Sequence, residues 1–133
     1  MKKIFFLAPM LIIFSCQVQN EPPIINSVNL TSSNIQKVEG AFLEFNYDFS
    51  DDSGLNQFRA SILDNFEDAR FQSAPWNWEK DYDLSGTSSL DTIQVALPFP
   101  DLEPGRYELT ITVQDINEAE TVKKNIFYIY EYE

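Results

Sequence analysis

Acidic and amide side chains gather in two predicted turns of this 133-residue chain. Asp51 and Asp52 precede a Ser-Gly pair in the first turn, and Asp115, Asn117 and Glu118 lie in the second. Calcium takes about six to eight oxygen ligands from carboxylates, amides and backbone carbonyls. If the turns meet, these five residues could hold a Ca²⁺ ion. The alternative is ordinary turn chemistry, because Asp, Asn, Ser and Gly favour turns for backbone reasons.

A second group of candidate functional residues, aromatic and polar side chains, lies in the segment 64–82. This segment shows no clean strand period and is long for a connection between strands. Aromatic rings beside polar groups commonly grip a partner protein or stack on a sugar. We therefore predict a binding site made of Arg70, Phe71, Trp76 and Trp78, with Trp78 the better candidate of the two tryptophans. The alternative is that Phe66 and one tryptophan fold back over the core.

Catalytic chemistry has little support. The chain has no histidine, so the common serine triads, Cys–His pairs and usual zinc sites are excluded. Carboxylate pairs are plentiful, and Asp64, Glu67 and Asp68 would be the nearest to an acid–base group. No acid stands in a recognisable catalytic context, so we expect a protein that is not an enzyme.

The first residues have the pattern of an export signal. Lys2 and Lys3 precede the apolar run 4–14, which is too short to cross a bilayer comfortably. The run ends in Ile-Phe-Ser-Cys, which resembles a lipobox, the bacterial signal for lipidating a cysteine. We predict a signal peptide over 1–15, a lipid on Cys16 with a tether to residue 23, and a domain over 24–133. The alternative is an ordinary signal peptide with an incidental cysteine.

Charge and cysteine content limit the partners. Loss of Lys2 and Lys3 would leave seven basic and 21 acidic residues, a net charge of −14. Such a chain disfavours nucleic acid, whose binding depends on basic contacts to phosphate. Cys16 is the only cysteine, so no intrachain disulfide can form. Gln17 rather than Asp after the cysteine fits retention in an outer membrane, so the lipid is the expected link to the cell envelope.

Period-two alternation dominates the rest of the chain, and frequent turn residues interrupt it. It predicts about seven antiparallel strands, at residues 24–30, 41–49, 57–62, 82–86, 92–97, 107–114 and 121–130. This number of strands over about 100 residues is typical of an all-β, immunoglobulin-like or fibronectin-type sandwich. Pro104-Gly105-Arg106-Tyr107 has the pattern of a tyrosine corner, in which the hydroxyl group bonds back to the preceding backbone.

Two longer motifs, YDFSDDSGLNQFRASILDNF from residue 47 and PGRYELTITVQDINEAET from residue 104, flank a tryptophan-bearing stretch. Together they resemble the small exported lipoproteins of domain-of-unknown-function family 4625. The resemblance covers most of residues 22–130 and implies an immunoglobulin-like fold, a lipid anchor and no assigned activity. The family often carries histidines near the end of the third strand. Here those positions are Gln57, Leu63, Asp64 and Asp68, so no histidine metal site carries over.

Two functions of different class are compatible with these patterns. The first is a lipid-anchored, non-catalytic binding module that meets a protein or glycan through the segment 64–82. The second is a structural envelope domain stabilised by Ca²⁺ at the acidic turns. In either case, the tether enters at the first strand, so we expect the acidic turns to face the membrane and the aromatic segment to point away from it.

Overall fold

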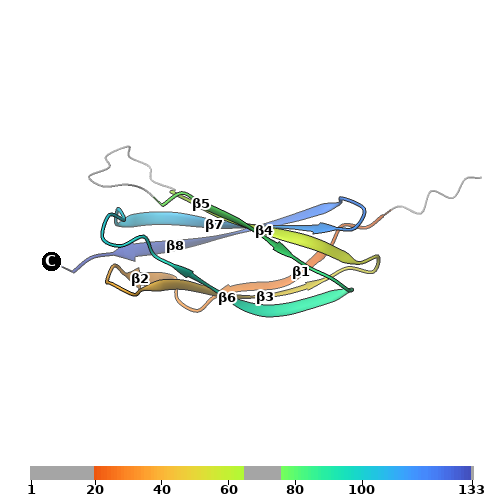
Figure 1. Ribbon diagram of the computed structural model, residues 1–133, viewed down its shortest axis with the longest axis horizontal. Helices are drawn as coiled ribbons and strands as arrows, with labels where there is room; N and C mark the ends of the chain where they lie inside the picture. Colours follow the sequence, from red (N-terminus) through yellow and green to blue (C-terminus); the bar gives the residue numbers. More distant parts are fainter. Residues whose placement is uncertain (1–19, 65–75, 133) are drawn as a thin grey trace, which may run out of the picture.

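The computed structural model describes residues 20–64 and 76–132, and every regular element in these ranges is a β-strand. There are eight strands: β1 (Ile24–Leu30), β2 (Asn34–Gln36), β3 (Phe42–Ser50), β4 (Leu55–Asp64), β5 (Trp78–Asp83), β6 (Ser88–Ala96), β7 (Gly105–Asp115) and β8 (Glu120–Tyr130). They form an elongated body whose two layers of strands lie face to face (Figure 1). The all-β prediction is confirmed.

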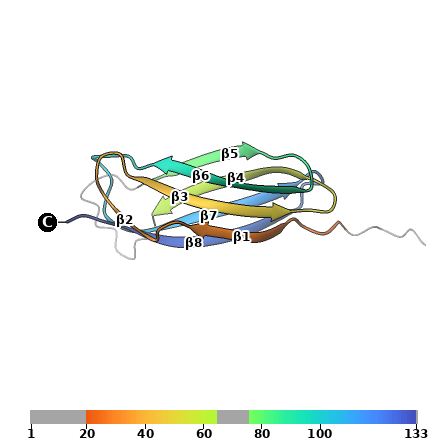
Figure 2. The same ribbon diagram turned by 90° about the horizontal axis from the view of Figure 1, so that it is seen from below.

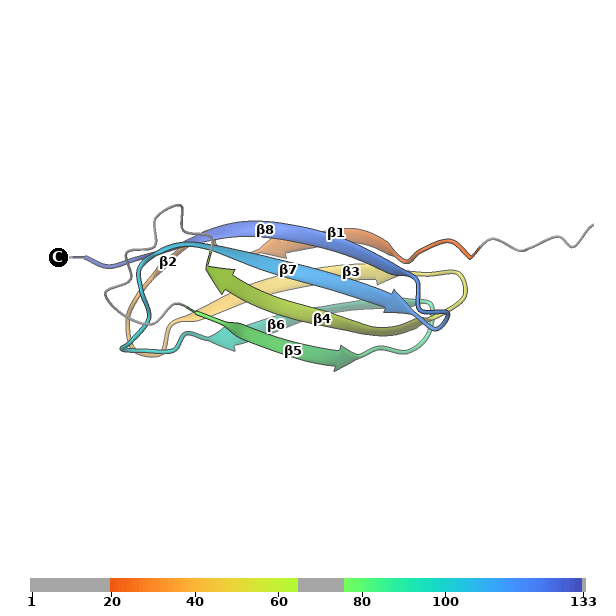
Figure 3. The ribbon, with the colours of Figure 1, turned by 90° about the horizontal axis from the view of Figure 1, so that it is seen from above.

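The smaller sheet has the strand order β1-β3-β6 and the larger one β2-β8-β7-β4-β5 (Figures 2 and 3). All pairs are antiparallel except β2 with β8. The prediction of seven antiparallel strands therefore missed one. The additional strand, β2, is only three residues long and runs parallel to the end of β8.

The strand predicted at 82–86 was misplaced. The structure has a strand at Trp78–Asp83, which pairs with β4 from Gln57 to Ile62 and forms the edge of the larger sheet. The segment 64–82 is consequently not one long connection. Its last residues belong to the sheet, and the connection between β4 and β5 spans 65–77.

The core lies between the sheets and is built by the inward-facing half of each strand. Alternate residues of β3, β4 and β7 have almost no solvent exposure, as the period-two pattern predicted. They comprise Leu43, Phe45, Tyr47 and Phe49 on β3, Phe58, Ala60 and Ile62 on β4, and Tyr107, Leu109, Ile111 and Val113 on β7. Burial of these side chains is the main stabilising contribution, at roughly 25 cal/mol for each Å² removed from water.

The predicted tyrosine corner is present. The Tyr107 hydroxyl group donates a hydrogen bond to the carbonyl oxygen of Glu103 at 2.6 Å. Burial raises the pKa of this hydroxyl to about 12, so it stays a protonated donor at neutral pH. The bond ties the start of β7 to the connection that crosses over from the other sheet.

The connections divide between two poles of the body (Figure 1). The tether-side pole contains the start of the described chain and the connections β3–β4, β5–β6 and β7–β8. The opposite, distal pole contains the connections β2–β3 and β6–β7, the end of β4, the start of β5 and the end of β8. The strands thus separate the start of the described chain from the end of β4 and the start of β5 by the length of the body.

Candidate functional site

The acidic turns do meet at the tether-side pole, and Asp115 is their centre. Its side chain is fully buried, and its Oδ1 atom accepts hydrogen bonds from the backbone N–H groups of Asn117 and Ala119, both at 2.9 Å. Its Oδ2 atom accepts one from the Asn20 amide at 2.8 Å. Burial alone would raise the pKa of Asp115, but these three hydrogen bonds together outweigh burial and lower it.

Asp51 plays a similar part in the turn between β3 and β4. Its Oδ2 atom accepts hydrogen bonds from the backbone N–H groups of Ser53 and Gly54, at 2.9 and 2.8 Å. This arrangement is the side-chain-to-backbone turn that Asp commonly makes. Its Oδ1 atom is different, because it is enclosed and has no hydrogen-bond partner among the residues that the structure describes. Asp51 therefore has one oxygen, Oδ2, that accepts hydrogen bonds and one, Oδ1, that is uncommitted, that is, without a donor among the described residues.

The five residues predicted to hold calcium are used mainly for turn geometry. Both oxygens of Asp115 and one of Asp51 are occupied by protein donors. Glu118 adopts a left-handed backbone conformation, with φ of 69°, and so shapes the β7–β8 turn. Within residues 20–64 and 76–132, no three acidic side chains converge as a metal-binding group. Calcium binding stays a prediction, with fewer free oxygens than the sequence suggested.

The contribution of Asn20 was missed by the sequence analysis, which assigned it to a polar tether. Besides donating to Asp115, it accepts hydrogen bonds from the Ser53 hydroxyl at 3.1 Å and from the Asn117 amide at 3.0 Å. One side chain thus joins the entering chain to both acidic turns. Nothing in the local pattern distinguishes Asn20 from the other polar residues around it, so only the three-dimensional arrangement reveals it.

The two tryptophans of the predicted binding site have different surroundings. Trp76 is only 4% exposed, and its ring makes edge contacts with the rings of Tyr107 and Phe127. It therefore belongs to the core, which corrects its assignment as an exposed binding residue. Trp78 opens β5, is partly exposed and packs against the margin of the core. Trp78 thus remains a candidate for contact with a partner.

Other predicted positions lie outside the described residues, namely Cys16 with the signal peptide, and Phe66, Glu67, Asp68, Arg70 and Phe71. Asp64, by contrast, is described, and it is the exposed last residue of β4.

Exposed apolar side chains occur toward both poles, and somewhat more of them lie at the distal pole. Ten large hydrophobic residues are exposed in the described ranges, and six of them lie there: Val38, Phe42, Leu63, Phe99, Tyr128 and Tyr132. They come from strand ends and connections of both sheets, close in the fold to the ends of the segment 65–75. The other four, Ile24, Leu90, Ile116 and Val122, lie toward the tether-side pole.

Strand order and site together define the class of protein. The strand that follows β4 pairs with β4 and not with β6, so the molecule is the fibronectin-type variant of the immunoglobulin-like sandwich. Within this class, a family model described as a domain of unknown function, DUF4625, matches residues 14–129. The chain belongs to this family. No curated protein matches it in sequence. Separately, the described ranges contain no helix that is long and apolar enough to span a membrane.

Proposed function

We propose that this protein is a lipid-anchored, non-catalytic binding module of the bacterial cell envelope. In this proposal Cys16 carries the lipid, and the distal pole contacts the partner. The observation that supports it best is the separation of the poles. The chain enters at one end, and six of the ten exposed apolar residues lie toward the other, where an anchored domain is most accessible.

The chemistry of the distal pole favours a protein as the partner. Sugar recognition relies on flat aromatic faces with convergent polar groups, whereas the six exposed groups here combine four aromatic rings with the aliphatic side chains of Val38 and Leu63. Apolar groups of mixed shape suit the complementary surface of a protein. The partly exposed Trp78 lies at the start of β5, at the same pole, and large aromatic side chains of this kind often dominate binding energy.

Site-specific photo-crosslinking in intact cells tests this proposal. A crosslinking amino acid at Phe42 or Leu63 samples the distal pole, and the same group at Leu90 samples an exposed position nearer the tether. We expect a discrete crosslinked protein species from Phe42 and Leu63 and none from Leu90. Equal species from all three positions, or none, would refute the proposal, and a crosslink only to glycan would replace the protein partner by a sugar.

The anchor is tested separately. Cells fed an alkyne-bearing fatty acid should label the full chain, and Cys16→Ser should abolish the label because the chain has no other cysteine. A Cys16→Ser chain that keeps the label would remove the anchor from the proposal. The crosslinking result at the distal pole would still stand.

A further inference from the structure

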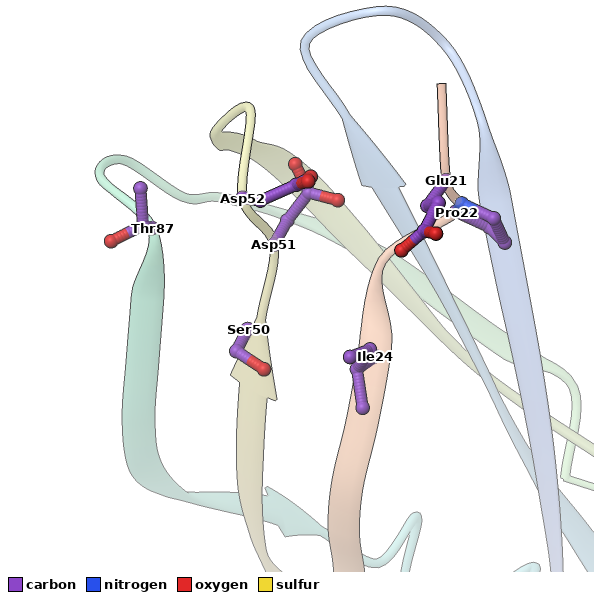
Figure 4. A pocket seen from close by; sticks show the side chains of 7 residues that line it. All are labelled: Glu21, Pro22, Ile24, Ser50, Asp51, Asp52 and Thr87. Atoms are coloured by element: carbon purple, nitrogen blue, oxygen red, sulfur yellow. The ribbon is translucent and has the colours of Figure 1, made fainter. Parts of the chain in front are cut away.

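A pocket opens at the tether-side pole between the segment before β1 and the ends of β3 and β6. Its volume is about 530 Å³. The lining residues are Glu21, Pro22, Ile24, Ser50, Asp51, Asp52 and Thr87. Figure 4 shows Asp51 and Asp52 together on the β3–β4 turn, with Glu21 across the pocket on the chain that leads into β1. Three carboxylates thus border one pocket, although the sequence places Glu21 far from the other two.

Asp51, whose Oδ1 atom has no hydrogen-bond partner among the described residues, lines this pocket. The residue is only 5% exposed, and its Oδ1 atom has no hydrogen-bond partner among the described residues, while Oδ2 is held by two backbone N–H groups. Burial of a carboxylate oxygen without a hydrogen-bond donor costs free energy. A charged donor in the pocket would relieve this cost. Glu21 and Asp52 are exposed side chains that can rotate to admit it.

The pocket suits an organic cation better than a metal ion. Calcium needs about six to eight oxygens at close range, and no three acidic groups of the described ranges converge in that way. One oxygen of Asp51 is also already committed to the turn. On the side of the entering chain, the wall also offers apolar surface, from Pro22 and the half-exposed side chain of Ile24. Carboxylates on one side and an apolar wall on the other match a charged group on an aliphatic stem.

We infer that this pocket binds an alkyl cation, a primary ammonium or guanidinium group on an aliphatic stem like the end of a lysine or arginine side chain. The charged end lies toward Asp51 Oδ1 and the rim acids Glu21 and Asp52, and the stem lies along Pro22 and Ile24. Hydrogen bonds to an ionised carboxylate are the stronger kind, so Asp51 contributes most of the affinity. This site is separate from the distal pole and does not depend on the proposed partner.

The test is a titration of the full-length chain, isotopically labelled and held in zwitterionic detergent, with n-butylammonium chloride. Amide NMR signals are followed at constant ionic strength. We expect saturable shifts at Ser50–Gly54, Glu21 and Thr87, and none with n-butanol, which has the stem without the charge. Asp51→Asn should weaken binding by about tenfold or more, whereas Asp91→Asn, a matched loss of charge on β6 outside the pocket, should change it less than about twofold.

Asp51→Asn keeps a carbonyl oxygen for the N–H groups of Ser53 and Gly54, so we expect it to fold. Should it unfold, the rim variant Glu21→Gln/Asp52→Asn takes its place, with an expected weakening of several-fold. Equal weakening by Asp91→Asn would mean general attraction to an acidic protein and would overturn the inference. Absence of saturation would overturn it as well. So would Ca²⁺ saturating the same amides at lower concentration than butylammonium, and that result would support the calcium hypothesis instead.

Discussion

Asp115 shows how one side chain can organise a pole of the molecule. An Asn side chain has one oxygen and one NH2 group, so it can satisfy only one side of this site. With the NH2 group at the Oδ2 position, it faces the Asn20 amide donor; with the NH2 group at the Oδ1 position, the bonds from the N–H groups of Asn117 and Ala119 are lost. We expect Asp115→Asn to lower the free energy of unfolding at pH 7 by about 1–3 kcal/mol, the usual cost of unsatisfied buried polar groups. Urea denaturation of the two proteins measures the difference.

The pH dependence of that difference has a definite sign. Since the folded-state pKa of Asp115 is lowered, its carboxylate contributes stability above the unfolded-state value of about 3.9, and the contribution is lost as pH falls through the folded-state pKa. The gap between the wild type and Asp115→Asn should therefore narrow in acid. A gap that stays constant from pH 7 to strongly acidic pH would contradict the role given to the ionised side chain.

The two tryptophans give a second residue-scale prediction. Trp76→Ala removes a buried ring that contacts Tyr107 and Phe127, so we expect a loss of about 3–5 kcal/mol. Trp78→Ala removes a partly exposed ring and should cost less than about half as much. Chemical denaturation of both variants decides this. Equal losses, or a larger loss for Trp78→Ala, would reverse their assignment as core and margin.

The sequence left open that one tryptophan would cover the core and favoured Trp78 as the exposed one, but no local signal identified Trp76 as the core residue. Trp76 and Trp78 are two positions apart in a stretch without period, and their difference arises from the place where β5 begins. Likewise, Asn20 and the free oxygen of Asp51 depend on contacts between distant segments. Residue types indicated the acidic pole, whereas the hydrogen-bond partner of each carboxylate oxygen follows only from the three-dimensional structure.

Among the elements, the start of β7 depends on the tyrosine corner. Tyr107→Phe removes the hydrogen bond to the Glu103 carbonyl while it keeps the buried ring, so we expect a loss of about 1–2 kcal/mol. The raised pKa of about 12 favours the folded state only while the hydroxyl is protonated. This stability is fully present below about pH 10, the unfolded-state value, and is lost as pH rises toward 12. The difference in free energy of unfolding between the wild type and Tyr107→Phe should therefore be smaller above pH 11 than at pH 8. A difference that grows with pH would contradict this role of the hydroxyl group.

Strand prediction succeeded where the alternation is uninterrupted and both neighbours are strands, as in β3, β4 and β7. In β1 a bulge between Ile25 and Ser27 shifts the register, so Ile25 packs inward and Ile24 is 56% exposed, contrary to simple alternation from Ile24. In β5 the inward-facing position of Lys80 breaks the apolar pattern. Its ammonium group lies 4.9 Å from the ring centre of Tyr82, which an edge strand permits. Three-residue β2 has too few positions to show any period.

At the scale of the whole molecule, the essential feature is polarity along the long axis. Hydrogen bonds through Asn20 hold the start of the described chain against the two acidic turns of the tether-side pole. The sequence predicted the acidic turns at the end where the chain enters, and the structure places them there. The set of six exposed apolar residues at the distal pole could not be predicted, because it combines ends of strands from both sheets.

The central claim, that the distal pole binds a partner protein, is tested most directly by charge substitutions at matched exposed positions. Phe42→Asp and Leu63→Asp add a charge at the distal pole, and Leu90→Asp adds one to an exposed residue nearer the tether. The measurement is the yield of the partner complex after chemical crosslinking in intact cells, normalised to the amount of folded chain. The account predicts a loss of about tenfold or more for the two distal variants and an unchanged yield for Leu90→Asp. Undiminished yield from both distal variants, or an equal loss with Leu90→Asp, would contradict it.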